Sequence, residues 1–385
     1  MKNNKVLMLL TNSFINDSRV LKEARSLVRA GYDVTLACYN YGDLSKKEMI
    51  EGIKVRRIFY YKPKNLQKGL FSNLVETFFL FRYYLVVLLR FGKTDIIHCN
   101  DLLTLPLGVL VKYLRFGKKK IVYDAHEYET EINGIKGLRK RIYIIMERSL
   151  IGYADAVFNV SESFANEYVR LYNIPKPALV LNCPPYAETP TKNIFRETLG
   201  IGENKMVFLY QGGFTPGRGI EMILSAFKRI RDPNKAIVFM GYGPLGPQIQ
   251  KAAEDYSHIY YHDAVGPNVL LNYTASADIG ILYYEDTCLN HRYCSPNKLF
   301  EYTMAGIPMI ASNLFEIRRL LEKYQNGIVV ENNDTDSLVA AIESVTQDGL
   351  DRMKENIGEM KEKYCWENQE KTMLEVYNNV RKKLP

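Results

Sequence analysis

The sequence predicts an α/β protein with two doubly wound parallel sheets, one in each of two domains that face each other across a cleft. Three observations lead to this prediction. Short apolar runs of strand length alternate with helix-length segments along the chain. A proline-containing stretch at residues 182–190 breaks this alternation into two series. Finally, 385 residues exceed one ordinary domain, and 47% hydrophobic and 24% charged residues are globular values.

The first series defines a domain over residues 1–185, and the second defines a domain over residues 186–365. In each domain the hydrophobic pattern predicts strands with helices between them. In the first domain the strands are predicted at 6–10, 33–38, 54–59, 96–99, 121–123, 156–160 and 178–181. In the second domain they are predicted at 206–210, 236–240, 258–262, 279–282, 309–311 and 327–330. Because ligands bind at the carboxyl ends of parallel strands, we look for functional side chains there.

The two series differ in charge. Residues 1–180 carry 29 Lys and Arg against 17 Asp and Glu, within a net charge of +8 for the whole chain. Basic clusters lie at 56–57, 118–120 and 139–141. They indicate a domain that docks on an anionic membrane surface or on a phosphorylated acceptor, although each cluster alone also fits an ordinary solvated surface. We expect no nucleic-acid partner.

The segment 70–91 is apolar at helical spacing on most of its circumference. Glu76, Arg82 and Arg90 interrupt it, so its apolar runs fall short of the roughly 20 residues that span a bilayer. We expect a helix that covers the core and exposes an aromatic edge. Insertion at a membrane interface is the alternative.

The cysteines indicate the cellular compartment. The six of them, at 38, 99, 183, 288, 294 and 365, form no CxxC pair, which favours a reducing environment. Residues 1–5 lead directly into a strand, so we expect no signal peptide. The expectation is a cytoplasmic protein, with peripheral attachment to the inner face of the cell membrane left open.

The segment 295–312 carries the most informative motif. Pro296 can open a helix, because its missing N–H belongs to the unpaired first turn. Asn297 and Lys298 then lie at a helix start, where free N–H groups and the helix dipole suit a phosphate. Glu301, one turn later, can accept hydrogen bonds from sugar hydroxyls. The motif therefore predicts a nucleotide-sugar site.

A glycine-rich loop at 209–220 follows the first strand of the second domain. Its glycines, Gly212 and Gly213 among them, let the backbone approach a ligand closely, and Arg218 can bind phosphate oxygens. We expect phosphate contact here. The alternative is a simple connector with a solvated arginine.

Two further patterns resemble cofactor or metal sites. Residues 241–246 resemble a dinucleotide-binding fingerprint, but they follow the second strand and include a proline, so we expect a tight turn. Asp334 and Asp336 form a D-x-D string just before an apolar helix, where an N-cap explains them better. The five histidines have no ligand spacing. We therefore expect neither a cofactor nor a metal.

In the first domain, polar residues follow two apolar strands. His98 and Asp101 end one strand, and His126 and Glu127 end the other. Because strand ends meet ligands, we expect these side chains to contact substrate, His126 above all. A lone histidine is more often a hydrogen-bonded structural residue, and this alternative stays open for His98.

Together these residues resemble a known family. From end to end the chain is similar to the GT-B glycosyltransferases, specifically the family-4-like retaining enzymes that build bacterial polysaccharides and glycolipids. The matching pieces occur in order, at 16–24, 98–101, 123–127, 212–219, 241–244 and 295–308. The resemblance implies two Rossmann-like domains, of which the first binds the acceptor and the second binds the nucleotide sugar. It also implies that the last helix, within 366–385, packs back on the first domain.

The resemblance implies roles for single residues. Glu301 looks like the carboxylate that holds the nucleotide ribose. Asn297 and Lys298 look like the diphosphate-binding helix start, and Arg218 looks like their basic partner. His126 matches the histidine that family members place beside the donor sugar and the reacting centre.

Other positions follow the family or depart from it. Ala264 and Val265 fall where the family presents backbone to the base. The family often has two glutamates eight positions apart, and the earlier one falls at Tyr293 here. A second basic residue of the phosphate loop falls at Gly213 and is absent.

The sequence therefore predicts transfer of a sugar from a nucleoside diphosphate donor, UDP-linked, to a hydroxyl of a glycan or lipid-linked acceptor. The resemblance implies retention of configuration and a role in bacterial surface polysaccharide synthesis. Two alternatives stay open. One is a nucleotide-sugar 2-epimerase of the same architecture, which needs no acceptor. The other is a non-catalytic sugar-binding partner in a synthase complex, which the departure at Tyr293 suggests.

Overall fold

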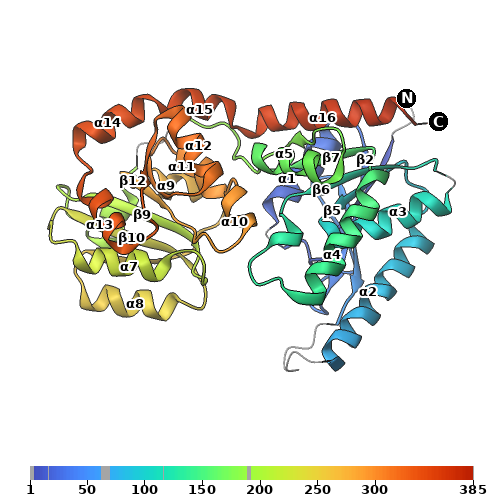
Figure 1. Ribbon diagram of the computed structural model, residues 1–385, viewed down its shortest axis with the longest axis horizontal. Helices are drawn as coiled ribbons and strands as arrows, with labels where there is room; N and C mark the ends of the chain where they lie inside the picture. The colour runs from blue at the N-terminus through green and yellow to red at the C-terminus, as the bar shows by residue number, and fades with distance from the viewer. Residues whose placement is uncertain (1–3, 16, 62–69, 116, 189–191, 385) are drawn as a thin grey trace. The chain divides into compact units, whose positions relative to one another are not determined.

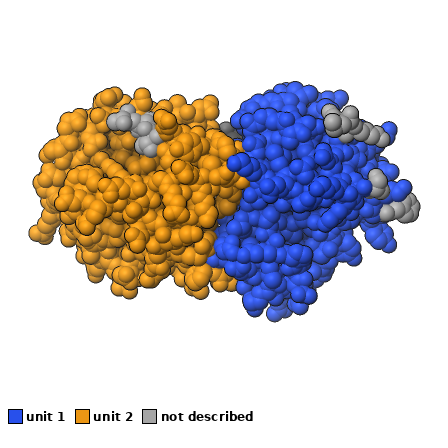
Figure 2. All heavy atoms as spheres, turned by 90° about the horizontal axis from the view of Figure 1, so that it is seen from above, with its two compact units in different colours: residues 1–180, 370–385 blue, residues 181–369 orange. Residues whose placement is uncertain are grey.

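The computed structural model describes residues 4–15, 17–61, 70–115, 117–188 and 192–384. The chain forms two compact units (Figures 1 and 2). Unit 1 contains residues 1–180 and 370–385, and unit 2 contains residues 181–369. Each unit is built on one sheet of mainly parallel strands, so the predicted fold class is confirmed. Of the proline-containing stretch 182–190, residues 189 and 190 lie outside the described residues, as does Asn16 of the first motif.

The sheet of unit 1 has eight strands in the order β3-β4-β2-β1-β5-β6-β7-β8. Its strands are β1 (Lys5–Leu9), β2 (Asp33–Asn40), β3 (Lys47–Ile50), β4 (Ile53–Phe59), β5 (Ile96–Asn100), β6 (Lys120–Ala125), β7 (Ala156–Asn159) and β8 (Ala178–Leu179). All pairs are parallel except β3 with β4. The sequence does not predict β3, because this short edge strand is exposed and starts with Lys47 and Glu48, which lack the apolar pattern of a buried strand.

Helices cover both faces of this sheet (Figure 1). The helices are α1 (Ser18–Arg29), α2 (Leu70–Arg90), α3 (Leu105–Leu114), α4 (Gly137–Leu150) and α5 (Glu162–Tyr172). Right-handed crossovers put α1 on one face and α2 to α5 on the other. The last helix, α16 (Trp366–Lys382), belongs to unit 1 from Glu370 onward. There the Tyr377 ring packs 5.6 Å from the Tyr32 ring and 6.3 Å from the Phe158 ring.

The sheet of unit 2 has six parallel strands in the order β11-β10-β9-β12-β13-β14. They are β9 (Met206–Gly213), β10 (Lys235–Tyr242), β11 (Ile259–Asp263), β12 (Ile279–Leu282), β13 (Met309–Ser312) and β14 (Gly327–Val330). The strand order reverses between β9 and β12, and in unit 1 it reverses between β1 and β5. In doubly wound sheets these switch points open a crevice at the carboxyl ends of the strands, where ligands bind.

The helices of unit 2 are short, and those that follow a strand begin at the carboxyl side of the sheet. They are α6 (Ile194–Leu199), α7 (Ile220–Arg229), α8 (Gly246–Asp255), α9 (Leu270–Thr274), α10 (Leu289–Tyr293), α11 (Asn297–Met304), α12 (Phe315–Tyr324), α13 (Thr335–Glu343), α14 (Gln347–Glu355) and α15 (Ile357–Lys363). Apolar residues of α7, α8 and α13 pack with β9, β10 and β12 into one buried core.

Tyr302 fixes α11 to the switch point of unit 2. Its buried hydroxyl donates to the carbonyl oxygens of Leu209 on β9 (3.0 Å) and Ile281 on β12 (3.3 Å), and it accepts from the N–H of Gln211 (3.3 Å). The ring lies against Gly280, where a β-carbon would come within 2.5 Å of it. The glycine therefore lets α11 approach the two central strands closely.

The glycines at 241 and 243 serve packing between neighbouring strand ends. A β-carbon at Gly241 would lie 1.9 Å from the carbonyl oxygen of Gly212. Gly243 has a positive φ of 149°, and a β-carbon there would lie 2.5 Å from the carbonyl oxygen of Phe214. Protein backbone occupies the space where a side chain of either residue would lie. The fingerprint-like pattern therefore reflects a close turn.

Helix α2 has two apolar faces. Tyr83 and Val87 are buried against the sheet, and the Tyr83 hydroxyl donates to the carbonyl oxygen of Ala37 at 2.9 Å. Phe78 and Phe81 are exposed on the opposite side. Among the described helices none is long and apolar enough to cross a membrane.

A buried carboxylate holds α4 and α5 together. The hydroxyls of Tyr123, Tyr168 and Tyr172 donate to the two carboxylate oxygens of Glu147 at 2.6 to 2.7 Å. Glu147 is completely buried, and this burial raises the pKa of its carboxyl, while the three hydrogen bonds oppose the rise. Three donors on one carboxylate compensate for much of its lost hydration.

Replacing Tyr168 with phenylalanine leaves this buried carboxylate one donor short. We expect the free energy of unfolding to fall by about 1–3 kcal/mol, measured by urea denaturation. The control is Tyr153→Phe, because the Tyr153 side chain is exposed and its hydroxyl has no hydrogen bond among the described residues. Equal stability of Tyr168→Phe and the unchanged protein would contradict this account of Glu147.

Candidate active site

Helix α11 begins at Asn297, directly after Pro296, and no side chain caps it. Pro296 occupies the N-cap position, one residue before the first helical turn in which the sequence places it. Its carbonyl oxygen accepts the N–H of Leu299 at 2.9 Å. The helix ends where expected, since Gly306 adopts a left-handed φ of 74°. The first N–H groups of α11 thus form an uncapped helix start, of the kind that binds anions.

Lys298, in the first turn of α11, is a buried cation without a hydrogen-bond acceptor in the described part of the chain. Its Nζ lies 3.9 Å from the ring centroid of Tyr210 and 5.1 Å from that of Tyr284. Burial, followed by repulsion from Arg218, lowers the pKa of Lys298 to about 7. An anion in this place would reverse both effects, because it would pair with the ammonium group.

Arg218, on the glycine-rich loop after β9, comes to the same place. Its Nη1 donates to the Tyr284 hydroxyl at 2.5 Å, and its Cζ lies 4.9 Å from the centre of that ring. No ion pair joins Arg218 or Lys298 to a carboxylate among the residues that the structure describes. The next residue, Gly219, has a φ of 69°, and a β-carbon there would lie 2.4 Å from the Tyr283 ring, so only glycine lets the loop pass this close.

Glu301 lies one turn along α11 and is held by a chain of hydrogen bonds. Its Oε2 accepts from Nε2 of Gln211 at 2.6 Å, and the Oε1 of Gln211 accepts from the Thr274 hydroxyl at 2.8 Å. Gln211 also precedes Gly212, whose φ is 121° and which lies beside the Lys298 stem. Gly213 follows as the last residue of β9.

The structure thus brings Gly212, Arg218, Lys298 and Glu301 together at the carboxyl end of β9. Sequence reasoning does not identify Tyr210, Gln211 and Tyr284 as part of this group, because their roles depend on contacts between strands. The only signal in the sequence is that Tyr210 and Gln211 directly precede the glycine pair.

The structure also gives the places of four further residues of unit 2. Ala264 and Val265 follow β11, which β10 separates from β9. Tyr293 ends α10, and its ring packs 6.1 Å from that of Phe315. Arg292, another basic residue of this region, is paired with Asp286 at 2.8 Å.

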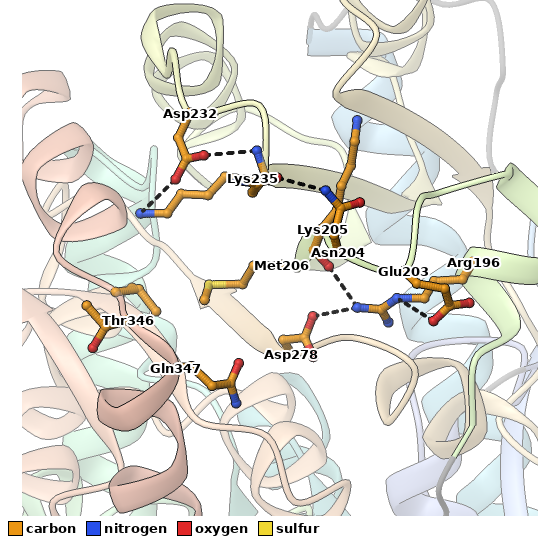
Figure 3. Close-up of a pocket in the computed structure, with 12 residues that line it drawn as sticks. Arg196, Glu203, Asn204, Lys205, Met206, Asp232, Lys235, Asp278, Thr346 and Gln347 are labelled. Atoms are coloured by element: carbon orange, nitrogen blue, oxygen red, sulfur yellow. Dashed lines mark hydrogen bonds and ion pairs between the residues drawn. The ribbon is translucent and has the colours of Figure 1, made fainter.

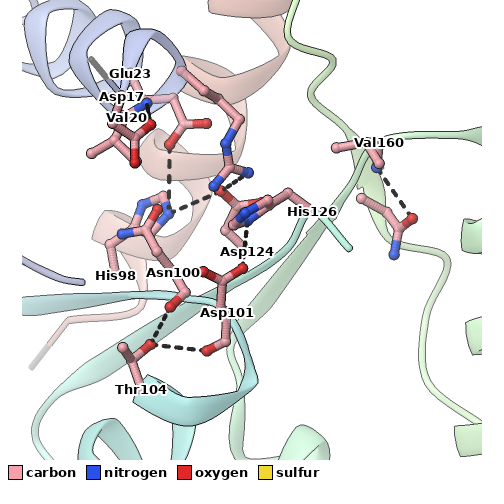
Figure 4. Close-up of polar contacts among 12 residues, drawn as sticks. Asp17, Val20, Glu23, His98, Asn100, Asp101, Thr104, Asp124, His126 and Val160 are labelled. Carbon is pink, nitrogen blue, oxygen red and sulfur yellow. Dashed lines mark hydrogen bonds and ion pairs between the residues drawn. The ribbon is translucent and has the colours of Figure 1, made fainter. Parts of the chain in front are cut away.

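In unit 1, His126 and Asp101 meet at the carboxyl ends of β6 and β5, with 2.8 Å between Nδ1 and Oδ1 (Figure 4). Burial and Arg19 lower the pKa of His126, but the Asp101 carboxylate outweighs them and the pKa is raised overall. Asp101 has a φ of 66°, which is strained for a residue with a side chain. Its N–H donates to the carbonyl oxygen of Asp124 at 3.1 Å, which holds that conformation.

His98 occupies a different environment from His126. Its position near the end of an apolar strand predicts a substrate contact. However, His98 lies within β5, its ring is fully buried, and its Nδ1 shares a 2.6 Å hydrogen bond with the Tyr377 hydroxyl of α16. Its Nε2 lies 3.7 Å from both Glu23 and Asp124 (Figure 4). This arrangement fits the structural alternative for His98. Burial and the Asp124 carboxylate raise the pKa of Glu23 to about 7.

The donor atoms of Glu23, His98 and Asp124 are close enough to share a metal ion. The sequence gives no hint of this cluster, because the three residues come from separate segments. The Arg19 guanidinium already lies 2.7 Å from Asp124 and supplies a positive charge there. Arg19 thus compensates Asp124, whereas neither carboxylate oxygen of Glu23 has a hydrogen-bond partner among the described residues.

Two other sequence-based expectations concern acidic residues. Asp334 caps α13, where its side chain accepts the N–H of Ser337 at 2.7 Å, so the N-cap explanation of the D-x-D string is confirmed. Glu127 is exposed beside His126. Glu129, which the sequence does not single out, has its pKa raised to about 8 by burial and by Asp101 and Glu127.

A polar cavity of about 450 Å³ lies elsewhere in unit 2 (Figure 3). Met206 and Lys235 line it and begin β9 and β10, so it lies at the opposite strand ends from Lys298. Its charges are paired within the protein: Arg196 with Asp278 at 3.0 Å, and Lys235 with two carbonyl oxygens at the end of α13. We assign this cavity no part in the site.

Two basic side chains, an uncapped helix start and a fixed carboxylate at a switch point define an enzyme class that handles phosphorylated nucleotides. Comparison with known families is more specific. A family described as glycosyltransferase family 4 matches residues 18–184, and one described as glycosyl transferases group 1 matches residues 205–348. The chain belongs to the glycosyltransferases with the GT-B fold and is a glycosyltransferase enzyme.

Individual relatives agree with this. An uncharacterised glycosyltransferase of Methanocaldococcus jannaschii is 25% identical over 380 residues, which cover 92% of this chain and 91% of that protein. Sucrose-phosphate synthase from Thermosynechococcus elongatus has a similar structure, with a TM-score of 0.77 at 16% identity over 99% of this chain and 100% of that one. HepE from Anabaena, solved with UDP and glucose, has a TM-score of 0.72 at 12% identity over 99% and 100% of the two chains.

The depressed pKa of Lys298 makes a prediction for the protein without ligand. The folded protein releases the Lys298 proton near pH 7, whereas the unfolded chain keeps it up to the ordinary lysine value of 10.5. We expect Lys298→Met to be more stable than the unchanged protein at pH 7, because a buried charge is removed, and we expect this advantage to shrink as the pH rises toward 10.

Urea denaturation across this pH range measures the effect. Lys382→Met is the control, because Lys382 is exposed on α16, and it should give no pH-dependent difference. A stability difference for Lys298→Met that stays constant over the range would show that the Lys298 pKa is not depressed.

Proposed function

We propose that this enzyme transfers a hexose-type sugar from a UDP-linked donor to a hydroxyl of a glycan or lipid-linked acceptor, with retention, in bacterial surface polysaccharide synthesis. One observation carries the proposal. Two cations, Arg218 and Lys298, converge on the Tyr284 ring beside an uncapped helix start, and neither forms an ion pair with a carboxylate among the described residues. Such an arrangement is costly unless a dianionic ligand compensates for it. The diphosphate of a nucleotide sugar has the required charge.

The two cations would act mainly on the leaving group. As the bond between sugar and phosphate breaks, negative charge grows on the β-phosphate oxygen. Arg218, Lys298 and the N–H groups at the start of α11 are already oriented by protein contacts, so they need little rearrangement to stabilise this charge. Diphosphate binding would also raise the pKa of Lys298, so the lysine would be charged in the complex even though it is partly neutral without ligand.

Glu301 would bind the ribose hydroxyls. The hydrogen bond from Gln211 fixes one oxygen of the Glu301 carboxylate and thereby holds the side chain in place. Ala264 and Val265 would present their backbone to the base, as the family resemblance suggests. The UDP-linked donor is supported by the solved complex of HepE with UDP and glucose.

In unit 1, His126 would orient the sugar or the acceptor through hydrogen bonds. The Asp101 carboxylate favours its protonated form, so His126 suits a donor role better than that of a nucleophile. For retention, the departing phosphate would take the proton of the attacking hydroxyl on the same face of the sugar. Glu127 and Asp101 would contribute to the acceptor side of the site.

The proposal also covers the need for a metal and the cellular location. We propose that the reaction needs no metal, since Arg218 and Lys298 supply the positive charge that a metal would otherwise bring. We place the protein in the cytoplasm, because its six cysteines are all free, as in a reducing compartment.

The first test is ligand binding. UDP should raise the melting temperature, because a ligand that binds only the folded state stabilises it, and the shift should persist in EDTA. Arg218→Ala should lose most of this shift, whereas Arg292→Ala should keep it, because Arg292 is already paired with Asp286. A shift that appears only with added Mg²⁺ or Mn²⁺ would contradict metal-independent binding.

The second test is turnover. With the donor identified by binding, Arg218→Ala and Lys298→Met should each lower kcat by about 100- to 1000-fold, the usual effect of removing one preorganised stabilising group. Arg292→Ala again serves as the control. Unchanged turnover in both variants would exclude the proposed site.

Product analysis in the same assay separates the alternatives. A transferase forms a new glycoside only when acceptor is present, whereas an epimerase changes the donor without acceptor. UDP binding without turnover on any acceptor would favour the non-catalytic partner.

A further inference from the structure

Helix α2 exposes a continuous apolar stripe on its outer face. Five large apolar residues follow helical spacing there and are between 46% and 76% exposed: Leu74, Phe78, Phe81, Leu85 and Leu89. They fall within one narrow arc of the helix, opposite the buried Tyr83 and Val87. Single exposed apolar residues are ordinary, but a stripe that runs from Leu74 to Leu89 on a helix that already buries its other face is not.

Helix α4 repeats this pattern. Leu138, Ile142 and Ile145 are at least half exposed, again at helical spacing and opposite the buried Tyr143 and Glu147. Since α2 and α4 cover the same face of the sheet, both stripes point away from it.

The helices α2, α3 and α4 are neighbours on this face (Figure 1). The Tyr84 hydroxyl of α2 donates to the carbonyl oxygen of Leu103, just before α3, at 2.6 Å. Glu76 of α2 is close enough to Arg139 of α4 to contribute to its raised pKa. Tyr113 and Leu114 of α3 are exposed as well. We refer to the exposed residues of α2, α3 and α4 as the outer surface.

The charge of the outer surface is strongly basic. The three helices contain seven Lys and Arg against two Glu, and one of those, Glu147, is buried. Arg141 and Arg148 flank the apolar stripe of α4, are exposed, and have no ion pair among the described residues. Apolar side chains with unpaired arginines beside them match the acyl and anionic headgroup layers of a bilayer.

We propose that unit 1 docks on an anionic lipid bilayer through this outer surface, with the stripes of α2 and α4 inserted at the headgroup level. The observations favour a membrane over a protein partner, because the apolar stripes of α2 and α4 and the arginines without ion pairs beside them present the same outward face. The helices lie on the bilayer surface and do not cross it.

The position of α2 also suggests which acceptor the enzyme uses. Its first half lies at the carboxyl end of β4, where the Phe79 ring packs 5.8 Å from those of Phe59 and Tyr60. Tyr61 and Phe59 are exposed there. The outer surface thus reaches the carboxyl edge of the sheet on which the proposed function places the acceptor, with β2 and β1 lying between β4 and the ends of β5 and β6. On that basis, which rests on the proposed function, the acceptor is the lipid-linked one.

Vesicle binding tests the docking without donor or acceptor. The full chain should cosediment with vesicles of equal parts phosphatidylcholine and phosphatidylglycerol, and hardly with phosphatidylcholine alone, and high salt should weaken binding. Phe78→Ser with Phe81→Ser should reduce binding by at least about a hundredfold. Arg141→Gln with Arg148→Gln should reduce it by about thirtyfold on anionic vesicles.

Matched controls are available in unit 1. Met49→Ser and Lys47→Gln alter an exposed apolar and an exposed basic residue of β3, and neither should change vesicle binding. All variants should keep the thermal shift with UDP, which shows that they fold and that the donor site is separate from docking.

Failure of the full chain to bind anionic vesicles at low salt would overturn the proposal, as would equal binding by the outer-surface variants. So would sedimentation analysis showing a dimer that the phenylalanine substitutions dissociate, because the stripe would then be covered by a second copy. Each of these results leaves the UDP shift, and hence the proposed transfer reaction, unaffected.

Discussion

The candidate donor site depends on one buried hydroxyl. Tyr302 bonds to β9 and β12 at once, so it fixes α11 relative to the only two strands whose carboxyl ends diverge in unit 2. Lys298 and Glu301 precede Tyr302 on the same helix, about one turn apart, so this contact sets the position of both. Gly280 makes the contact sterically allowed, since any side chain there would collide with the ring. The chemistry of α11 therefore rests on a tyrosine and a glycine that touch no substrate.

The buried charges of Glu147 in unit 1 and Lys298 in unit 2 have opposite surroundings. In unit 1, Glu147 is satisfied by three tyrosine hydroxyls and Arg19 is paired with Asp124, so these charges stabilise the fold or cost it little. In unit 2, Lys298 faces aromatic rings and another cation. Natural proteins retain such unfavourable groups where function requires them. The contrast separates structural polar residues from functional ones better than burial alone does.

Sequence patterns predict most of the fold, because buried parallel strands are continuous apolar runs and the helix around 297–304 has recognisable ends. They fail for β3, whose polar exposed residues carry no such pattern. They also fail for Gln211, Glu23 and Tyr377, since each owes its role to a partner more than 70 residues away in the chain or on another element. His98 shows the same limit, because its place near the end of a strand cannot reveal that Tyr377 of α16 bonds to it. The positions of Arg218, Lys298 and Glu301 are predictable, since a glycine loop and a helix start follow strands of the same sheet.

The lowered pKa of Lys298 affects how strongly the proposed donor site attracts anions. Without its ligand, this side chain is charged only part of the time near pH 7, so small inorganic ions in the cell meet a weaker electrostatic attraction than a fixed ammonium would offer. A larger anionic molecule that binds there through several contacts favours protonation of Lys298. It then interacts with a fully charged ammonium group. At the proposed donor site, a weakly basic lysine would therefore couple strong anion binding to the uptake of one proton.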